Sequence, residues 1–222
     1  MTAAPELALA IVISGRGSNM AAIAQACARG TIGARVARVI ADRPDAGGIA
    51  VAHSLGLQTA VVAARDFSDR AAFERALAAA IDASGARLVV LAGFMRILSP
   101  EFAQRYAGAM LNIHPSLLPK FPGLHTHQRV LEAGDPMHGA SVHFVTGELD
   151  AGPVVLQARV PVLPGDTAGQ LSARVQQQEH IIYPQAIGLI AAGRLRLVEG
   201  TPHLDGQPLV QPLVTFTGAA PT

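Results

Sequence analysis

The stretch that decides the fold is LALAIVISGRGSN, residues 7–19. Residues 7–14 form a continuous apolar run, which is typical of a β-strand buried on both faces of a parallel sheet. The glycine-rich residues 15–18 then predict a turn, and residues 19–29 predict a helix. A helix N-terminus directly after such a turn is suited to binding phosphate. A turn that binds nothing is the alternative, because neither a Walker A lysine nor the third glycine of the dinucleotide motif follows.

Working outward, strands and helices alternate through the first half of the chain. Strands are expected at 35–41, 58–63 and 87–92, and helices at 48–55, 69–83 and 100–106, the last two capped by Ser68 and Ser99. This alternation predicts right-handed βαβ units, and hence an α/β protein with a parallel sheet flanked by helices. Such sheets bind ligands beyond the carboxyl ends of their strands, so we expect the functional site there.

The second half has a different pattern, with a loop rich in proline, glycine and histidine from residue 114 to 126. Strands are expected at 110–113, 141–145, 154–160 and 194–198, with a helix at 127–133 and a long helix from Asp166 to about Ala192. Nothing in the sequence is typical of an internal repeat or an interdomain linker. We therefore expect a single domain, 1–222, with an N-terminal half (1–108) and a C-terminal half (109–222).

The composition excludes several classes of protein. With 50% hydrophobic and 15% charged residues, the chain is not intrinsically disordered, and a net charge of +1 without a basic block gives no sign of a nucleic-acid partner. No apolar run reaches the ~18 residues of a membrane span, and residues 1–9 lack the basic start of a signal peptide. These features predict a cytoplasmic location without membrane partners. The single cysteine, Cys27, is expected to be a small buried residue on a helix.

Five of the eight histidines lie within residues 114–143, at positions 114, 125, 127, 138 and 143. The pair at 125 and 127 suggests a metal site, but without an HExxH motif or cysteine ligands we expect no metal. His114 is the better candidate for chemistry. If residues 110–113 form a strand, Asn112 and His114 share a face at its carboxyl end. An amide that can stabilise an oxyanion beside an imidazole suits acyl transfer. A hydrogen-bonded histidine at a strand end is the structural alternative.

Two carboxylates extend this hypothesis. Asp150 lies in a turn, where it either has a structural role or orients His114 and favours its charged form. Glu179 lies within the long helix, where it is either solvated or, if the helix follows the cleft, able to hold a substrate ammonium group. The sequence has no serine elbow, and Cys27 is on a helix, so a covalent acyl-enzyme has no evident nucleophile. This favours direct transfer between two bound substrates.

Seven segments, in order along the chain, resemble one known family. They are SGRGSN (14–19), LAGFMRILSP (91–100), LNIHPSLLP (111–119), FPGLHTH (121–127), HGASVHFV (138–145), ELDAGP (148–153) and RVQQQEH (174–180). Together they are similar to the phosphoribosylglycinamide formyltransferases of purine biosynthesis, and the match runs from about residue 9 to residue 210. The resemblance implies a Rossmann-like formyltransferase fold. It also implies transfer of a formyl group from 10-formyltetrahydrofolate, the co-substrate, to the amine of glycinamide ribonucleotide.

The resemblance also implies roles for individual residues. Asn112, His114 and Asp150 match the family's catalytic trio. The ribonucleotide site is matched by Gly17, Ser18, Asn19, Gln176 and Glu179. The folate cleft is matched by Arg70, Met95, Arg96, Ile97 and Leu98, by Thr146, Gly147, Glu148 and Leu149, and by Asn112 and Asp150 of the trio. In this assignment the N-terminal half binds phosphate, and the C-terminal half carries catalysis and folate binding.

Two features of this chain depart from the family pattern. Gly147 stands where an acidic residue is common, and the order of Gln128 and Arg129 leaves a phosphate role for Arg129 open.

Three other functions are alternatives to this assignment. A methionyl-tRNA formyltransferase would need a further nucleic-acid-binding domain, and a formyltetrahydrofolate deformylase would need an N-terminal regulatory domain. A non-catalytic nucleotide-binding module would use only the glycine-rich loop. We expect small-molecule substrates. The sequence is compatible with a homodimer but does not determine the oligomeric state.

Overall fold

Strand β1 (Leu7–Ile13) lies inside an eight-stranded sheet, and all of its residues are buried. The computed structural model describes residues 6–216. The other strands of this sheet are β2 (Ala34–Ala41), β3 (Thr59–Val61), β4 (Leu88–Leu91), β5 (Met110–His114), β6 (Met137–Phe144), β7 (Val154–Pro161) and β11 (Leu213–Phe216). Their order is β11-β7-β6-β5-β4-β1-β2-β3, and β6 alone runs antiparallel to both of its neighbours.

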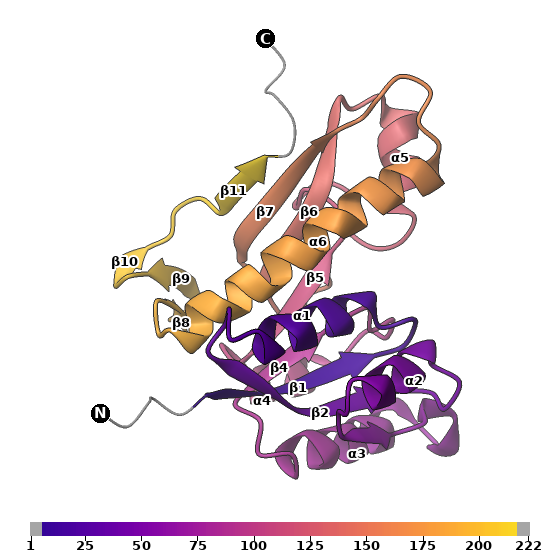
Figure 1. Ribbon diagram of the computed structural model, residues 1–222, viewed down its shortest axis with the longest axis vertical. Coiled ribbons are helices and arrows are strands. Elements are labelled where there is room, and N and C mark those ends of the chain that lie inside the picture. Colours follow the sequence, from indigo (N-terminus) through magenta and orange to yellow (C-terminus); the bar gives the residue numbers. More distant parts are fainter. Residues whose placement is uncertain (1–5, 217–222) are drawn as a thin grey trace.

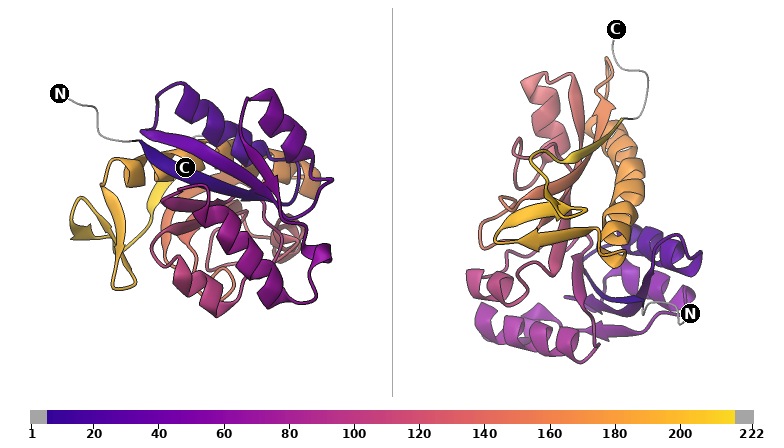
Figure 2. Two further views of the ribbon diagram at one scale, coloured as in Figure 1. Left: turned by 90° about the horizontal axis from the view of Figure 1, so that it is seen from below. Right: turned by 90° about the vertical axis from the view of Figure 1, so that its left-hand side faces the viewer.

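Helices cover both faces of the sheet (Figures 1 and 2). They are α1 (Ser18–Ala28), α2 (Gly47–Ser54), α3 (Arg70–Asp82), α4 (Pro100–Arg105), α5 (Thr126–Ala133) and α6 (Ala168–Ala191), with a short 3-10 helix η1 (Ala64–Asp66). Side chains of α1, α2, α5 and α6 pack into one hydrophobic core, and those of α3 and α4 pack into a second core on the other face. A small antiparallel sheet of β8 (Leu195–Val198), β9 (Thr201–Leu204) and β10 (Gln207–Pro208) follows α6.

Helix α6 is anchored across the middle of the sheet. The hydroxyl of the fully buried Tyr183 lies 3.0 Å from two carbonyl oxygens, those of Leu91, the last residue of β4, and Leu111, the second residue of β5. The apolar stripe of the helix, which includes Leu171, Val175 and Ile182, is buried. This anchoring places the middle of α6 beside α1, and with it the polar residues that interrupt the stripe.

The expected α/β architecture with a mostly parallel sheet is confirmed, whereas strand β11 and the 3-10 helix η1 were not expected, and several element ends differ. Asp69, rather than Ser68, caps α3, because its carboxylate accepts from the Ala72 N–H at 2.7 Å. Thr167, rather than Asp166, caps α6 through a capping box with Gln170. Asp166 instead pairs with Arg174, at 2.8 Å. The pair holds the pKa of this carboxyl near 2, because the Arg174 guanidinium donates to it.

Candidate active site

Strand β5 brings Asn112 and His114 to its carboxyl end, as its period of two predicts. In the antiparallel pair with β6, Asn112 lies opposite His143, and His114 lies opposite Ser141. His114 is buried and Asn112 is half-buried. The antiparallel return of β6 therefore adds a second histidine to the site.

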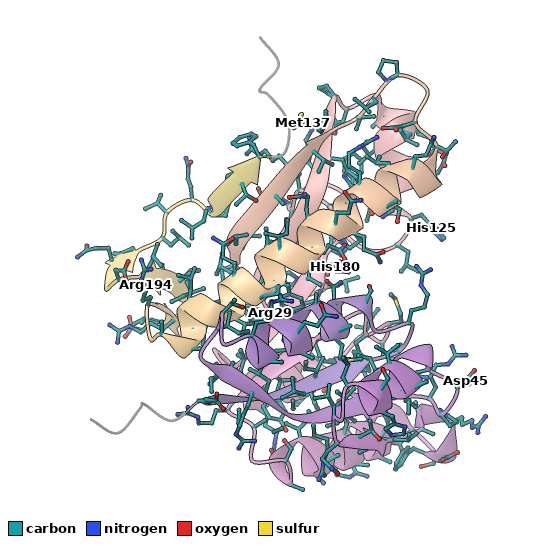
Figure 3. The ribbon with its side chains drawn as sticks, viewed as in Figure 1. Arg29, Asp45, His125, Met137, His180 and Arg194 are labelled. Atoms are coloured by element: carbon teal, nitrogen blue, oxygen red, sulfur yellow. The ribbon has the colours of Figure 1, made fainter. Side chains whose placement is uncertain are left out.

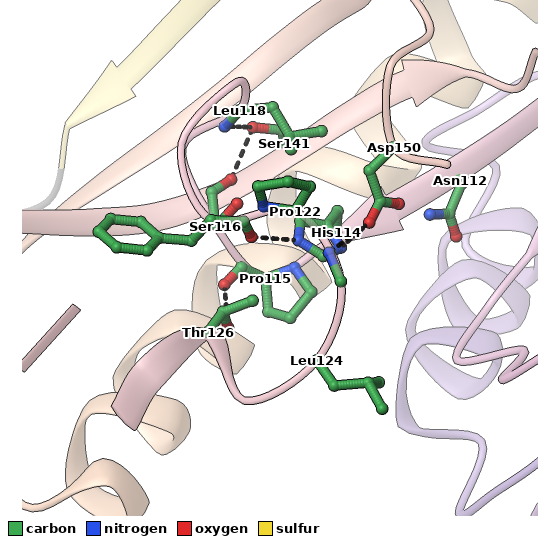
Figure 4. Close-up of polar contacts among 12 residues, drawn as sticks. Asn112, His114, Pro115, Ser116, Leu118, Pro122, Leu124, Thr126, Ser141 and Asp150 are labelled. Atoms are coloured by element: carbon green, nitrogen blue, oxygen red, sulfur yellow. Dashed lines mark hydrogen bonds and ion pairs between the residues drawn. The ribbon is translucent and has the colours of Figure 1, made fainter. Parts of the chain in front are cut away.

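The His114 ring is held between two acceptors (Figure 4). Its Nδ1 lies 3.3 Å from Asp150 Oδ2, and its Nε2 lies 3.0 Å from the carbonyl oxygen of Phe121. A carbonyl oxygen can only accept, so Nε2 carries a hydrogen. Nδ1 faces the carboxylate, so Asp150 fixes the orientation of the ring from its other side. Both side chains are 7% exposed, and water therefore screens their attraction little.

A tight turn between β6 and β7 delivers Asp150 to this position. Asp150 has a φ of 51°, in the left-handed region that aspartate tolerates better than most residues. Gly152 packs so closely against β6 that a Cβ there would overlap the carbonyl oxygen of Phe144. The Gly123 N–H also donates to Asp150 Oδ2, at 2.9 Å. Backbone shape thus places this carboxylate, together with one donor from the 114–126 loop.

His143 is a site residue that the sequence analysis did not single out. Its Nδ1 donates to the Phe144 carbonyl oxygen at 3.0 Å, and burial lowers the pKa of the ring. The neutral ring is then left with Nε2 as an acceptor, and this atom lies 3.1 Å from Asn112 Nδ2. His143 therefore orients the Asn112 amide and leaves one of its N–H groups for another acceptor. Only its place opposite Asn112 across a strand pair could have revealed it.

The loop from 114 to 126 is attached to buried polar groups. Ser141 Oγ donates to the Ser116 carbonyl oxygen at 2.7 Å and accepts from the Leu118 N–H at 3.1 Å. At the other end Thr126 Oγ1 donates to the Pro115 carbonyl oxygen, at 2.7 Å. These bonds, drawn in Figure 4, fix the loop that presents Phe121 and Gly123 to His114 and Asp150.

Arg129 holds the same loop from α5. It donates to the carbonyl oxygens of Pro122 (2.6 Å) and Leu124 (3.4 Å), and its guanidinium carbon lies 5.4 Å from the centre of the Phe121 ring. Its contacts in this structure are therefore with the loop.

The glycine-rich turn lies at the N-terminus of α1, where the sequence analysis placed it. Gly17 has a φ of 76° and directly precedes α1. The N–H groups in the first turn of the helix therefore face the glycine-rich turn, without partners inside the helix. Gly48 of α2 packs against it, since a Cβ on Gly48 would lie 3.1 Å from both Gly15 O and Gly17 Cα. The Gly48 N–H donates to Gly15 O at 2.9 Å. Two helix N-termini therefore meet at this turn, which is the geometry of an anion site.

The ribonucleotide residues predicted on α1 and α6 lie together. Asn19 Nδ2 donates to Glu179 Oε2 at 2.7 Å, and Gln176 Nε2 donates to Ser18 Oγ at 3.2 Å. Glu179 is 8% exposed, and burial raises the pKa of its carboxyl although the bond from Asn19 opposes this. His180, the next residue, is labelled in Figure 3 on the part of α6 that lies beside α1.

The residues predicted for a folate cleft come from three segments. Met95 and Ile97 are 71% and 61% exposed, whereas Leu98 is buried in the core beneath α3 and α4. Residues 146–149 form an exposed turn before Asp150. Arg70 lies on α3, 3.9 Å from the carboxylate of Glu74, which accepts hydrogen bonds from the Ser99 N–H and hydroxyl. Arg70 and Ser99 both line a groove of about 540 Å³ between α3 and α4 that contains no residue of the trio.

Gly147 lies where the 146–149 turn packs on Pro100. A Cβ at this position would lie 3.0 Å from Pro100 Cβ, so the absence of a side chain allows close packing here.

Within residues 6–216, no three histidine, cysteine, aspartate or glutamate side chains are grouped so that they could hold a metal ion. His127 Nδ1 lies 3.0 Å from His138 Nε2. Burial lowers the pKa of His138 to about 4. None of the helices in the described part of the chain is long and apolar enough to cross a membrane.

Comparison with known proteins gives consistent results. The profile of the formyl transferase family matches residues 7–187. The phosphoribosylglycinamide formyltransferase of Escherichia coli (strain K12) is 53% identical over 201 residues, which cover 90% of this chain and 95% of that protein. The enzyme of the same name from Haemophilus influenzae is 45% identical over an equal length. The structure of the Coxiella burnetii enzyme of that name superposes with a TM-score of 0.90 at 44% identity, covering 94% of this chain and 99% of that one.

Proposed function

Because the chain belongs to the formyl transferase family, we propose that it is a phosphoribosylglycinamide formyltransferase. It transfers the formyl group of 10-formyltetrahydrofolate to the amine of N1-(5-phospho-D-ribosyl)glycinamide, in the purine pathway. The observation that carries the proposal is the trio at the end of β5, in which Asn112 and His114 offer donors on one face and Asp150 contacts His114. This is the donor arrangement that an oxyanion requires.

The reaction proceeds by direct transfer. The glycinamide amine attacks the formyl carbon, and the formyl oxygen becomes an oxyanion that accepts from Asn112 Nδ2 and from His114. In the structure the His114 Nε2–H donates to Phe121 O, and the oxyanion takes the place of that carbonyl as acceptor. The intermediate collapses when the bond from the formyl carbon to N10 of the folate breaks. The amine loses one proton, through water near Asp150, and N10 gains one.

The two halves of the single domain divide the binding of the substrates. Gly17, Ser18 and Asn19 hold the phosphate at the N-terminus of α1, where peptide dipoles favour an anion. Glu179, with Gln176 beside it, holds the glycinamide end, because a buried carboxylate without a cationic partner among residues 6–216 favours a bound amine. The folate binds against the exposed apolar residues Met95 and Ile97.

The remaining folate contacts come from Arg70, Arg96, Leu98 and the turn of Thr146, Gly147, Glu148 and Leu149 before Asp150. The enzyme works in the cytoplasm on these two small molecules, without a metal. A homodimer is not needed for this site, whose proposed residues all come from one chain.

The test is turnover of 10-formyltetrahydrofolate, followed by absorbance with and without the ribonucleotide. Turnover that requires the ribonucleotide supports the proposal, and mass spectrometry of the product locates the formyl group. Loss of the formyl group to water at the same rate without the ribonucleotide would indicate a deformylase. No turnover under either condition would favour the nucleotide-binding module.

A further inference from the structure

Asp42 is a buried carboxylate to which the proposed reaction assigns no task. It follows β2 directly, and its side chain is 4% exposed. Its Oδ2 accepts from Arg96 Nε at 2.7 Å, whereas its Oδ1 is buried without a hydrogen-bond partner among the described residues. Burying a carboxylate is costly unless it is paired, so the bond to Arg96 is the main compensation at this position.

Asp42 and Arg96 meet because both of their segments are attached to the end of β1. The Asp42 N–H donates to the carbonyl oxygen of Ile13, at 3.2 Å, and the Met95 N–H donates to Ser14 Oγ, at 3.0 Å. Strand β1 lies between β2 and β4 in the sheet, so the segments that follow these two strands flank its carboxyl end. The ion pair therefore joins two loops at the edge of the sheet where the proposed site lies.

The contacts of Arg96 leave one edge of its guanidinium open. Nε is bound to Asp42, and the guanidinium carbon lies 5.5 Å from the centre of the buried Phe73 ring. In the part of the chain that the structure describes, no hydrogen bond uses its two terminal nitrogens, and the side chain is 46% exposed. Its neighbours Met95 and Ile97 are the exposed apolar residues of the proposed folate cleft. A fixed cation with two free donors thus adjoins an apolar surface.

We propose that Asp42 is a positioning residue that holds Arg96 ready to bind a carboxylate of the folate's glutamate group. A guanidinium offers two parallel N–H donors that match a carboxylate, and an arginine that is already immobilised loses less conformational entropy when it binds. Asp42 thereby determines how strongly the site prefers a glutamate-bearing folate over the same ring system without glutamate. This inference rests on the proposed function, because it assumes a folate in the cleft.

The experiment compares two ligands that differ only in this group. Binding of folic acid and of pteroic acid, which lacks the glutamate, is measured by calorimetry for the wild-type protein and for Asp42→Asn. We expect the substitution to weaken folic acid binding roughly three- to tenfold, the cost of immobilising one long side chain, and to leave pteroic acid binding unchanged. In the Arg96→Ala background Asp42→Asn has no further effect, because Asp42 acts through Arg96.

Asp45, in the same loop as Asp42, offers a matched control. Asp45 is bound by Arg43 at 2.7 Å and 2.5 Å in an exposed pair, so Asp45→Asn makes the same chemical change without touching Arg96. This variant should bind both ligands like the wild type. Equal weakening of both ligands by Asp42→Asn, no weakening of either, or additive losses with Arg96→Ala would overturn the proposal.

A measurement on the wild-type protein covers the case in which Asp42→Asn does not fold. Hydrogen exchange at arginine Nε, followed by NMR, should be slower for Arg96 than for the exposed Arg43, and equal rates would overturn the proposal. Wild-type turnover is measured in parallel. A protein that binds folic acid in preference to pteroic acid but transfers no formyl group contradicts the proposed function and leaves the positioning role supported.

Discussion

Asn19 Nδ2 donates to Glu179 Oε2 at 2.7 Å, across 160 residues of sequence. The bond joins the first turn of α1 to the middle of α6, and both side chains are 8% exposed. It joins the glycine-rich turn proposed to bind the phosphate to the carboxylate proposed to hold the glycinamide end.

The first prediction concerns the pH dependence of stability. Burial raises the pKa of Glu179 in the folded protein, so there the carboxyl keeps its proton at pH values at which it is ionised in the unfolded chain. The free energy of unfolding therefore falls as the pH rises through the folded pKa. Glu179→Gln removes this charge and keeps an oxygen to accept from Asn19. Its melting temperature should exceed that of the wild type at neutral pH, and the difference should shrink on acidification. Calorimetry between pH 4 and 8 measures it, and a difference independent of pH contradicts it.

The second prediction concerns the catalytic pair. His114→Ala and Asp150→Asn should each lower kcat by at least ~10², because the charged donor to the oxyanion is lost or no longer supported. Steady-state kinetics measures the effect, and circular dichroism checks that each variant is folded. Near-normal turnover of either folded variant removes the role assigned to that residue.

The third prediction concerns His143. His143→Phe leaves the Asn112 amide without the acceptor that orients it. We expect kcat to fall roughly three- to tenfold, which corresponds to the loss of about one hydrogen bond, and KM to change little. His143→Gln supplies a side-chain oxygen that can accept from Asn112, so it should retain more activity. If both variants lose activity equally, the orienting role is wrong.

The fourth prediction concerns the loop held by Arg129. Arg129→Met removes the bonds to Pro122 and Leu124, so the segment that presents Phe121 and Gly123 to the catalytic pair is less ordered. We expect kcat to fall by roughly tenfold, as for the loss of a hydrogen bond to a charged group. Gln128→Met is the matched control, since Gln128 donates to the exposed Glu132 side chain on the same helix and, among the described residues, makes no side-chain bond to the loop. Equal kcat values for the two variants would argue against a role of Arg129 in loop order.

The fifth prediction concerns the two glycines at the start of α2. A Cβ on Gly48 would lie 2.6 Å from Ile13 Cδ1 and 3.1 Å from Gly17 Cα, whereas a Cβ on Gly47 meets nothing nearer than 3.9 Å. Gly48→Ala should destabilise the protein by about 1–3 kcal/mol and raise KM for the ribonucleotide, because the phosphate-binding turn is displaced. Gly47→Ala should change neither. Thermal unfolding and initial rates test the pair, and similar results for the two variants would contradict the packing argument.

Local sequence patterns were sufficient for the core of the fold. Residues 7–13 are apolar without alternation, which predicts a strand covered on both faces, and β1 is buried throughout. Asn112 and His114 are two residues apart on a strand, so their common face follows from strand geometry alone. Asp150 was a candidate by its place in a turn and by family resemblance, yet its approach to His114 depends on a left-handed residue and on the close packing of Gly152.

Short-range geometry therefore accounts for the βα alternation, the glycine-rich turn before α1 and the pairing of residues along one strand. The burial of Glu179 against Asn19, the contact of His143 with Asn112 and the contact of Asp42 with Arg96 arise only when distant segments pack together. Each of these contacts depends on the order of strands in the sheet and on where a helix crosses it. That order results from burying the apolar faces of all elements together, and no local pattern records it.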